Sequence, residues 1–258
     1  MAILEVKNLN KSFGRNHVLR GIDFDLEKGE VLSIIGSSGS GKTTLLRCLN
    51  SLEFADEGQI IVNGETIFDA AINKRPSETE LRQKRLHFGL VFQNFNLFSS
   101  RTAGRNVAYP LEICGMPKGD IAARVSEMLA LVGLENDAEK MPSEISGGMQ
   151  KRAGLARAVV RRNDIILYDE PTSGLDPVTS VTINRLIRRL NKERGITSIV
   201  VTHDLQGALL FADRILMLKN GHVAELSAPA EFVRSSNPDV REFLAAQFIT
   251  PDLLEKKL

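Results

Sequence analysis

Eight consecutive residues near position 40 have the composition of a phosphate-binding loop. The segment Gly36–Thr43 reads Gly-Ser-Ser-Gly-Ser-Gly-Lys-Thr and matches the pattern G-x-x-x-x-G-K-[ST]. Its glycines let backbone N–H groups turn inward, and a helix beginning near Lys42 adds positive potential. Lys42 can reach the outer phosphates, while the Thr43 hydroxyl can ligate magnesium. The residues expected to bind nucleotide here are Gly36, Ser37, Ser38, Gly39, Ser40, Gly41, Lys42, Thr43 and Thr44.

Two adjacent acids follow a strongly apolar segment. Ile165–Tyr168 leads directly into Asp169 and Glu170. A strand of this kind delivers Asp169 to the carboxyl edge of a sheet, where it can hold magnesium through water. Glu170 can take a proton from the attacking water or orient it. Together with the phosphate loop, this pair predicts a nucleoside triphosphatase.

These two elements leave the class of triphosphatase open. A GTPase would carry Asn-Lys-x-Asp after a strand, whereas Asn191-Lys192-Glu193-Arg194 lacks the final acid and lies within a helical pattern. GTP is therefore discounted, and a small-molecule kinase stays possible on these motifs alone.

The elements that must position these residues alternate between strand and helix patterns. Short apolar, β-branched segments predict strands, and three are almost entirely apolar, as in parallel strands covered on both faces. Helical periodicity follows the glycine-rich turn and recurs at Ile121–Val132 and Pro177–Arg194. The predicted strands are Ile3–Val6, Val31–Ile35, Ile60–Val62, Ile165–Tyr168, Ser198–Val201 and Ile215–Leu218. This alternation predicts an α/β fold with a parallel sheet.

The composition excludes several other kinds of protein. A net charge of +1, from 33 basic and 32 acidic residues, gives no electrostatic reason to expect nucleic-acid binding. Two widely separated cysteines suggest neither a disulfide framework nor a zinc site. No segment approaches the roughly 18 apolar residues of a membrane span, and the N-terminus lacks a secretory signal. A cytoplasmic protein is therefore expected, and any membrane channel would come from another chain.

A third motif points to a family. Ile145–Gln150 reads Ile-Ser-Gly-Gly-Met-Gln and resembles the signature motif of ABC ATPases. Ser146 lies 23 residues before Asp169, the separation that this family shows. The resemblance implies that Ser146, Gly147 and Gly148 face the γ-phosphate of a partner subunit's ATP, so that two chains enclose two nucleotides.

Four other positions match motifs of the same family in the same order. Gln93 resembles the Q-loop glutamine, which senses magnesium and water, and Asp176 resembles the D-loop acid that crosses the dimer interface. His203 resembles the switch histidine at the γ-phosphate, and Phe13 resembles the aromatic residue that stacks on adenine. Two departures are Met149, where glutamine is commonest, and Phe13 in place of the more frequent tyrosine.

The resemblance implies a P-loop NTPase (RecA-like) core with an N-terminal antiparallel β subdomain and an inserted α-helical subdomain. The expected ATPase domain spans residues 1–246, with its core at 1–93 and 163–246 and the helical subdomain at about 94–162. Residues 247–258 are expected to form a C-terminal tail, and Thr250–Leu258 is expected to be poorly ordered.

The same resemblance implies ATP and Mg²⁺ as cofactors. The expected catalytic residues are Lys42, Gln93, Glu170 and His203, and the expected metal ligands are Thr43, Gln93 and Asp169. The expected partners are a second copy or a paired ATPase subunit and an integral membrane permease, with no nucleic acid. The chain would then lie on the inner face of the cell membrane, attached through that permease.

Two halves of the sequence suggest different transported substrates. The first half resembles ATPases of polar amino-acid importers, and the second resembles ATPases of the maintenance-of-lipid-asymmetry type. Stretches of the first kind are Ile34–Asn50, Val62–Ala71 and Arg85–Phe98. Stretches of the second kind are Asn106–Leu111, Met141–Arg152 and Asn237–Leu244. We slightly favour a lipid substrate, with the amino-acid importer as the alternative and a soluble non-transport ABC ATPase as the alternative of another class.

Overall fold

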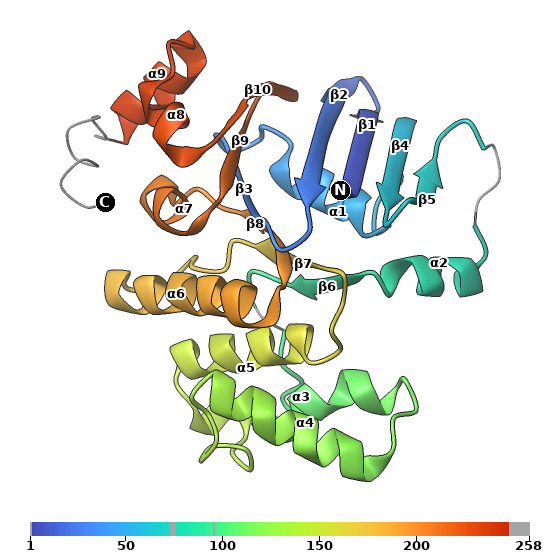
Figure 1. Cartoon of the computed structure of the whole chain (residues 1–258), viewed down its shortest axis with the longest axis vertical. Coiled ribbons are helices and arrows are strands. Elements are labelled where there is room, and N and C mark those ends of the chain that lie inside the picture. Colours follow the sequence, from blue (N-terminus) through green and yellow to red (C-terminus); the bar gives the residue numbers. More distant parts are fainter. Residues whose placement is uncertain (1, 73–75, 95, 248–258) are drawn as a thin grey trace.

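The computed structural model describes residues 2–72, 76–94 and 96–247. Within these residues the strands form two sheets (Figure 1). An antiparallel sheet has the order β2-β1-β4-β5, and a second sheet has the order β10-β9-β3-β8-β7-β6. The antiparallel sheet contains β1 (Ala2–Phe13), β2 (Asn16–Glu27), β4 (Glu57–Val62) and β5 (Glu65–Asp69). The second sheet contains β3 (Val31–Ile35), β6 (Phe88–Val91), β7 (Ile165–Asp169), β8 (Thr197–Val201), β9 (Arg214–Lys219) and β10 (His222–Ser227).

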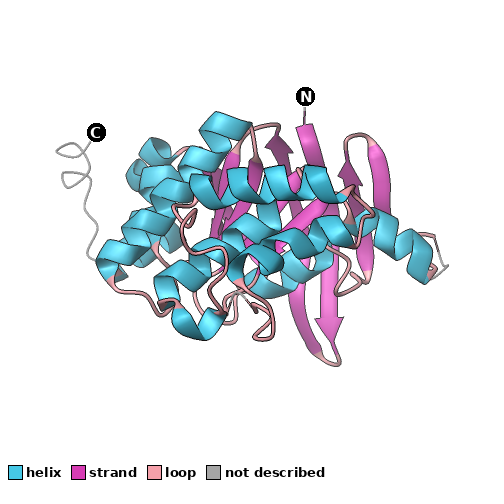
Figure 2. Ribbon diagram, turned by 90° about the horizontal axis from the view of Figure 1, so that it is seen from below, coloured by secondary structure: helices cyan, strands magenta, loops and turns pink. Residues whose placement is uncertain are grey.

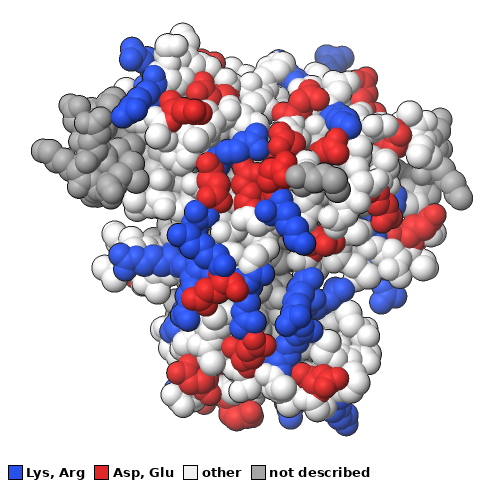
Figure 3. All heavy atoms as spheres, in the orientation of Figure 1, with Lys and Arg blue, Asp and Glu red and all other residues white. Residues whose placement is uncertain are grey.

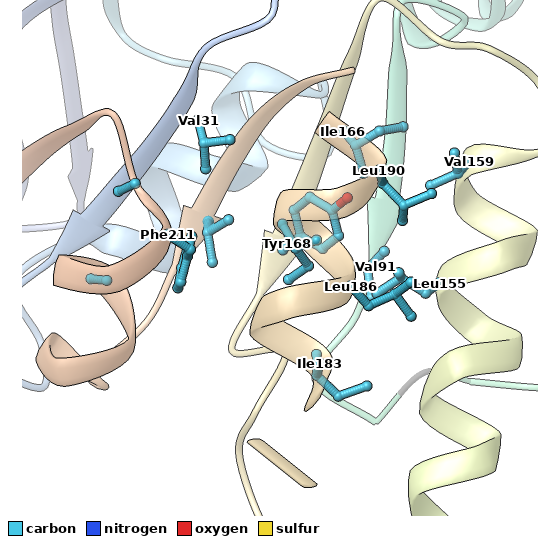
Figure 4. Packing of buried hydrophobic residues seen from close by; sticks show 14 of the residues in the cluster. Val31, Val91, Leu155, Val159, Ile166, Tyr168, Ile183, Leu186, Leu190 and Phe211 are labelled. Atoms are coloured by element: carbon cyan, nitrogen blue, oxygen red, sulfur yellow. The ribbon is translucent and has the colours of Figure 1, made fainter. Parts of the chain in front are cut away.

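The second sheet is parallel except at one edge, where β10 pairs antiparallel with β9. Its central strands are buried on both faces, which explains their continuous apolar sequence. In β7, Ile166 and Tyr168 point into one hydrophobic core, while Ile165 and Leu167 point into another. Figure 4 shows the first of these cores, where Tyr168 and Ile166 lie beside Leu186 and Leu190. Because β3, β6, β7 and β8 run parallel, their carboxyl ends lie at one edge of the sheet. Hydrophobic cores on both faces of the sheet hold these strands in place.

The helix α1 (Lys42–Leu49) fills the space between the two sheets. Its buried face, Leu45, Leu46, Cys48 and Leu49, belongs to one core together with side chains of β1, β2, β3 and β4. Helical spacing puts these four residues on one side, so the start of α1 is fixed against the end of β3.

Except for α2 (Glu78–Arg85), which lies below β4 and β5, the remaining helices cover the opposite face of the parallel sheet and extend below it (Figure 1). Seen from below, they lie in front of the strands (Figure 2). Between residues 96 and 162 the described chain forms only helices and turns: α3 (Ala103–Glu112), α4 (Lys118–Leu131), the short η1 (Pro142–Glu144) and α5 (Gly147–Val159). The others are α2 (Glu78–Arg85), α6 (Pro177–Arg194), α7 (Leu205–Phe211), α8 (Pro229–Arg234) and α9 (Pro238–Ala246).

The predicted fold class is confirmed. Each of the six predicted strands lies within an observed strand. The N-terminal part of the chain contributes an antiparallel sheet, and a group of helices lies between β6 and β7. The domain boundaries stay predictions. The predicted tail lies, apart from Gln247, outside the described residues, and so does the predicted disorder of Thr250–Leu258. In the part of the chain that the structure describes, no helix is both long and apolar enough to cross a membrane.

Candidate functional site

The loop between β3 and α1 has an open helix start. Gly41 precedes α1 with φ of 104°, in the left-handed region, and no side chain caps the helix. A Cβ on Gly41 would lie 2.9 Å from Cδ2 of Leu19, and one on Gly36 would lie 2.2 Å from the carbonyl oxygen of Leu218. Only glycine fits these two positions. The uncapped first turn therefore presents backbone N–H groups to an incoming anion.

The cation of this loop is folded back onto the loop itself. Lys42 is 9% exposed, and its Nζ donates to the carbonyl oxygens of Gly36 (2.7 Å) and Ser37 (2.9 Å). Burial lowers the pKa of Lys42, while the charges of Glu170 and Asp169 oppose that shift. The Ser40 hydroxyl is buried without a hydrogen-bond partner. A polyphosphate fits these groups because it would supply acceptors to the hydroxyl and the ammonium.

The rest of the predicted loop forms its accessible rim. Ser37, Ser38, Gly39 and Thr43 are exposed, and Thr44 is half-buried. The Thr43 hydroxyl is therefore open to a ligand bound at the start of α1.

Two adjacent acidic residues stand at the end of β7. Asp169 ends β7, and burial raises its pKa, with the charge of Glu170 adding to the shift and Arg47 and Lys42 opposing it. Glu170 has φ of 50°, and its N–H donates to the Val201 carbonyl at 2.9 Å. Asp169, Glu170 and Lys42 therefore lie near enough for their charges to affect one another.

A histidine completes this edge of the sheet. His203 follows β8, and its Nδ1 lies 2.7 Å from Oε2 of Glu170. The His203 backbone N–H also points to that oxygen, at 3.4 Å. The strained backbone of Glu170 is thus held at the sheet edge with its carboxylate facing His203.

Magnesium suits the donors present. Thr43 and Asp169 offer a hydroxyl and a carboxylate oxygen, which are ligands that Mg²⁺ prefers. Among the described residues no group of three or more His, Cys, Asp or Glu side chains could hold a metal. The donors fit an ion that takes one or two protein ligands and completes its shell with phosphate and water.

Gln93 is joined to Ser173, which lies three residues before Asp176. Its Nε2 donates to Oγ of Ser173 at 3.1 Å. The Ser173 carbonyl accepts from Nζ of Lys151, a buried residue of α5 whose pKa is lowered by burial. In the sequence, Lys151 could be noticed as a basic residue on the side of α5 that is otherwise buried. Ser173 therefore links the segment of Gln93 to α5.

The start of α5 is a second glycine-bearing helix terminus. Ser146 caps the helix, its Oγ accepting from the N–H of Met149 at 3.3 Å. A Cβ on Gly147 would meet nothing within 4 Å, whereas one on Gly148 would lie 3.1 Å from Thr179. Met149 packs against the main core, which explains an apolar residue at this position. The motif also contacts η1, because Nε2 of Gln150 donates to the Pro142 carbonyl at 2.8 Å.

Asp176 caps the neighbouring helix α6. Its carboxylate accepts from the N–H of Thr179 (2.9 Å) and from the Thr179 hydroxyl (2.5 Å), and these bonds lower the pKa of Asp176. Thr179 also faces Gly148. Asp176 and the start of α5 therefore share one neighbourhood.

Phe13 lies at the end of β1, and the residue is 49% exposed. It pairs with Asn16 across the turn to β2. Two residues further along β2, the Val18 carbonyl would lie 3.0 Å from a Cβ on Gly41. The turn carrying Phe13 therefore approaches the start of α1.

A parallel sheet with this glycine-rich loop after one strand and acids after another defines a P-loop nucleoside triphosphatase. The family described as "ABC transporter" matches residues 19–173. The methionine import ATP-binding protein MetN of Bordetella avium (strain 197N) is 40% identical over 260 residues, covering 99% of this chain and 70% of that protein. MetN of Brucella abortus (strain 2308) is 39% identical over 263 residues, covering 99% and 69%.

Solved structures give the same assignment. Clostridium perfringens cbiO1, described as part of the ABC transporter complex cbiONQ, is similar with a TM-score of 0.82 and 30% identity, covering 95% of each chain. The cassette MJ0796, in a dimeric post-hydrolysis state bound to ADP and Pi, has a TM-score of 0.76 and 34% identity, covering 88% of this chain and 98% of that one. This chain belongs to the ABC transporter family. It is an ATPase and an ATP-binding subunit of such a transporter.

The preference for a lipid substrate is not supported. The MetN proteins match 99% of the chain, so the match includes the second half, on which that preference rested. The amino-acid importer alternative is closer to these relatives.

Proposed function

We propose that this chain powers an amino-acid importer, with methionine or a chemically similar amino acid as the substrate. The observation that carries the proposal is the 40% identity to a methionine import ATP-binding protein over 99% of the chain. The resemblance of the first half to amino-acid importer ATPases agrees with it. The chain acts as one of two ATPase subunits beneath a separate permease, on the inner face of the cell membrane.

Nucleotide binding begins at the start of α1. The uncapped N–H groups receive the phosphates, and Lys42 exchanges the carbonyls of Gly36 and Ser37 for phosphate oxygens. Phe13 stacks on the adenine with its exposed face. Thr43, Asp169 and Gln93 would hold Mg²⁺, which, when bound, neutralises phosphate charge.

Hydrolysis depends on the acidic edge of the sheet. Glu170 orients the attacking water and accepts its proton, and the contact with His203 keeps that carboxylate at the sheet edge. His203 and Lys42 stabilise charge on the transferring phosphoryl group, which is mainly electrostatic catalysis.

A second ATPase subunit completes each site. Ser146, Gly147, Gly148 and Asp176 are offered to the nucleotide of the partner, and the dimeric cassette MJ0796 supports such pairing. Closure of the pair moves the helices around α5 and drives the permease. On the face shown in Figure 3, basic and acidic side chains are interspersed, so we propose protein partners rather than nucleic acid.

Replacement of Glu170 tests the proposed hydrolysis. Glu170→Gln should keep ATP binding and lower kcat by on the order of 10²–10⁴, because the amide cannot accept a proton. Size-exclusion chromatography with ATP should show an accumulated dimer. Glu193→Gln, on exposed α6 surface, is the matched control. Hydrolysis by Glu170→Gln at the wild-type rate would contradict the assignment.

Purification of the tagged chain from mildly solubilised membranes of its host tests the substrate. Mass spectrometry should identify a permease, and vesicles containing the complex should take up labelled methionine or a similar amino acid when given ATP. Recovery of a lipid-type permease would refute the importer assignment while leaving the ATPase assignment intact.

A further inference from the structure

A buried lysine joins the end of β1 to the loop that follows α1. Lys11 is 9% exposed, and its Nζ donates to the Phe54 carbonyl at 2.7 Å. The same ammonium pairs with Oε1 of Glu53 at 2.9 Å and with Oδ1 of Asp56 at 3.3 Å. Burial acts to lower the pKa of Lys11, but the hydrogen bonds and charges of both acids outweigh it and raise the pKa. Lys11 is therefore a charged group fixed by three partners.

The backbone of β1 is attached to the same loop on both sides of Lys11. The N–H of Ser12 donates to Oδ2 of Asp56 at 2.6 Å, and the N–H of Asp56 donates to the Asn10 carbonyl at 2.7 Å. This loop follows α1, the helix whose first turn belongs to the phosphate loop. The end of β1 is thus fixed relative to the far end of α1.

The strand pair of β1 and β2 also contacts the N-terminal end of α1. Lys11 pairs with Leu19 of β2, and Leu19 lies against the backbone of Gly41. The two strands therefore contact α1 at its start, through Leu19, and beyond its end, through Lys11. Such a double attachment sets the distance between the tip of β1 and the phosphate loop.

The ring of Phe13 is in contact with this ammonium. Nζ of Lys11 lies 5.0 Å from the ring centroid, within the range of a cation–π interaction. Phe13 as a whole remains 49% exposed, so a second flat group can still stack on its ring. Phe13 is the last residue of β1 before the turn, and without a buried neighbour its ring would be free to rotate.

We propose that Lys11 is a positioning residue for the nucleotide base: it orients the Phe13 ring and holds it at a fixed distance from the phosphate loop. Adenine and triphosphate then engage the chain together. The inference rests on the proposed role of Phe13 in stacking on adenine. Lys11 acts through the ring and touches no part of the nucleotide.

Calorimetric titration with two probes separates base from phosphate binding. A non-hydrolysable ATP analogue carries both parts, whereas inorganic tripolyphosphate lacks the base. Lys11→Met keeps the apolar stem and should weaken analogue binding about three- to tenfold, leaving tripolyphosphate binding unchanged. The matched control is Lys7→Met, because Lys7 lies on the same strand, is exposed and pairs with Glu5 at 2.8 Å. Equal losses for both probes, or no loss, would overturn the proposal.

A double-mutant cycle tests whether Lys11 acts through the ring. Phe13→Ala should weaken analogue binding at least as much as Lys11→Met, and the double variant should be no weaker than Phe13→Ala alone. Additive losses would overturn the proposal. If Phe13→Ala leaves analogue binding intact, the adenine site itself is wrong. If only Phe13→Ala weakens binding, the site stands and the role of Lys11 fails.

A second variant guards against misfolding of Lys11→Met. Asp56→Asn keeps the side-chain shape but weakens the attachment of both Lys11 and the Ser12 N–H. It should show the same selective loss for the ATP analogue, with a thermal unfolding transition near that of the wild type. Unselective or absent loss in a folded Asp56→Asn protein would also overturn the proposal.

Discussion

The helix starts at α1 and α5 both carry glycines but differ in what surrounds them. At α1, added Cβ atoms on Gly36 and Gly41 would collide with atoms of the same chain. At α5, Gly147 is exposed and has nothing within 4 Å of an added Cβ. Gly36 and Gly41 are required by this chain's own packing, and Gly147 is not.

The two helices also differ in their N-terminal caps. No side chain caps α1, so its first N–H groups are open to an anion, and a lysine of the same loop lies beside them. At α5 the Ser146 hydroxyl caps the helix by accepting from the Met149 N–H. A phosphate site at α1 can be built from one chain, whereas α5 presents a small, open surface that suits a close approach by another chain. This difference supports the proposed sharing of each nucleotide between two subunits.

The largest effect should come from removing the cation at α1. Lys42→Ala removes two hydrogen bonds that we propose pass from carbonyls to phosphates, so ATP affinity should fall roughly 10²-fold. Calorimetric titration with ATP measures this loss, and hydrolysis should disappear with it. Lys28→Ala, at an exposed lysine before β3, serves as the control. Normal ATP binding by Lys42→Ala would show that α1 is not the phosphate site.

A single added methyl group should act differently at the two helix starts. Gly41→Ala places its Cβ 2.9 Å from Leu19 at a φ of 104°, which should weaken ATP binding about tenfold or more through strain in the loop.

Gly147→Ala should leave folding and ATP binding unchanged, because nothing in the chain lies near the new Cβ. It should still lower ATP hydrolysis about ten- to hundredfold by crowding the proposed subunit interface. Binding by titration and turnover by phosphate release are compared for both variants. Full activity of Gly147→Ala would remove the support that α5 gives to a shared site.

The sequence predicts the strand and loop before α1 well, because the pattern that identifies them lies in consecutive residues. The strand Val31–Ile35 is predicted with its observed bounds, since it is buried on both faces and ends at a glycine that fixes the turn. By contrast, β1 is predicted only over Ile3–Val6 but extends to Phe13. Asn8 has φ of 47° at a register irregularity, and such a bulge interrupts the alternation on which strand prediction depends. β2 is not among the predicted strands, although Ile22–Leu26 alternates buried apolar and polar residues as a half-buried strand does.

Contacts between distant parts of the chain were not predictable from motifs. Lys11 and Asp56 are 45 residues apart, and Lys151 and Ser173 are 22 apart, so neither pair shares a local pattern. Each forms because folding brings two elements together around a buried ammonium that must find oxygen partners. The motifs therefore predict which residues meet the nucleotide, whereas the residues that hold them in place emerge only from the packed structure.

The smallest effect should come from changing Ser173, which links the segment of Gln93 to α5. Ser173 accepts from Gln93 through its hydroxyl and from Lys151 of α5 through its carbonyl. If Gln93 turns to magnesium when ATP binds, as proposed, it must give up the bond to Ser173. Ser173→Ala removes that competing acceptor and should lower KM for Mg-ATP about two- to tenfold, the worth of one hydrogen bond.

Ser143→Ala, at an exposed serine of η1, controls for the loss of a hydroxyl. The backbone bond from Lys151 persists in Ser173→Ala, so the attachment of α5 to this segment is preserved. Steady-state hydrolysis at varied Mg-ATP gives KM and kcat separately. A raised KM would mean that Ser173 holds Gln93 in its working position, and the region between α1 and α5 would then be preorganised rather than rearranged by nucleotide.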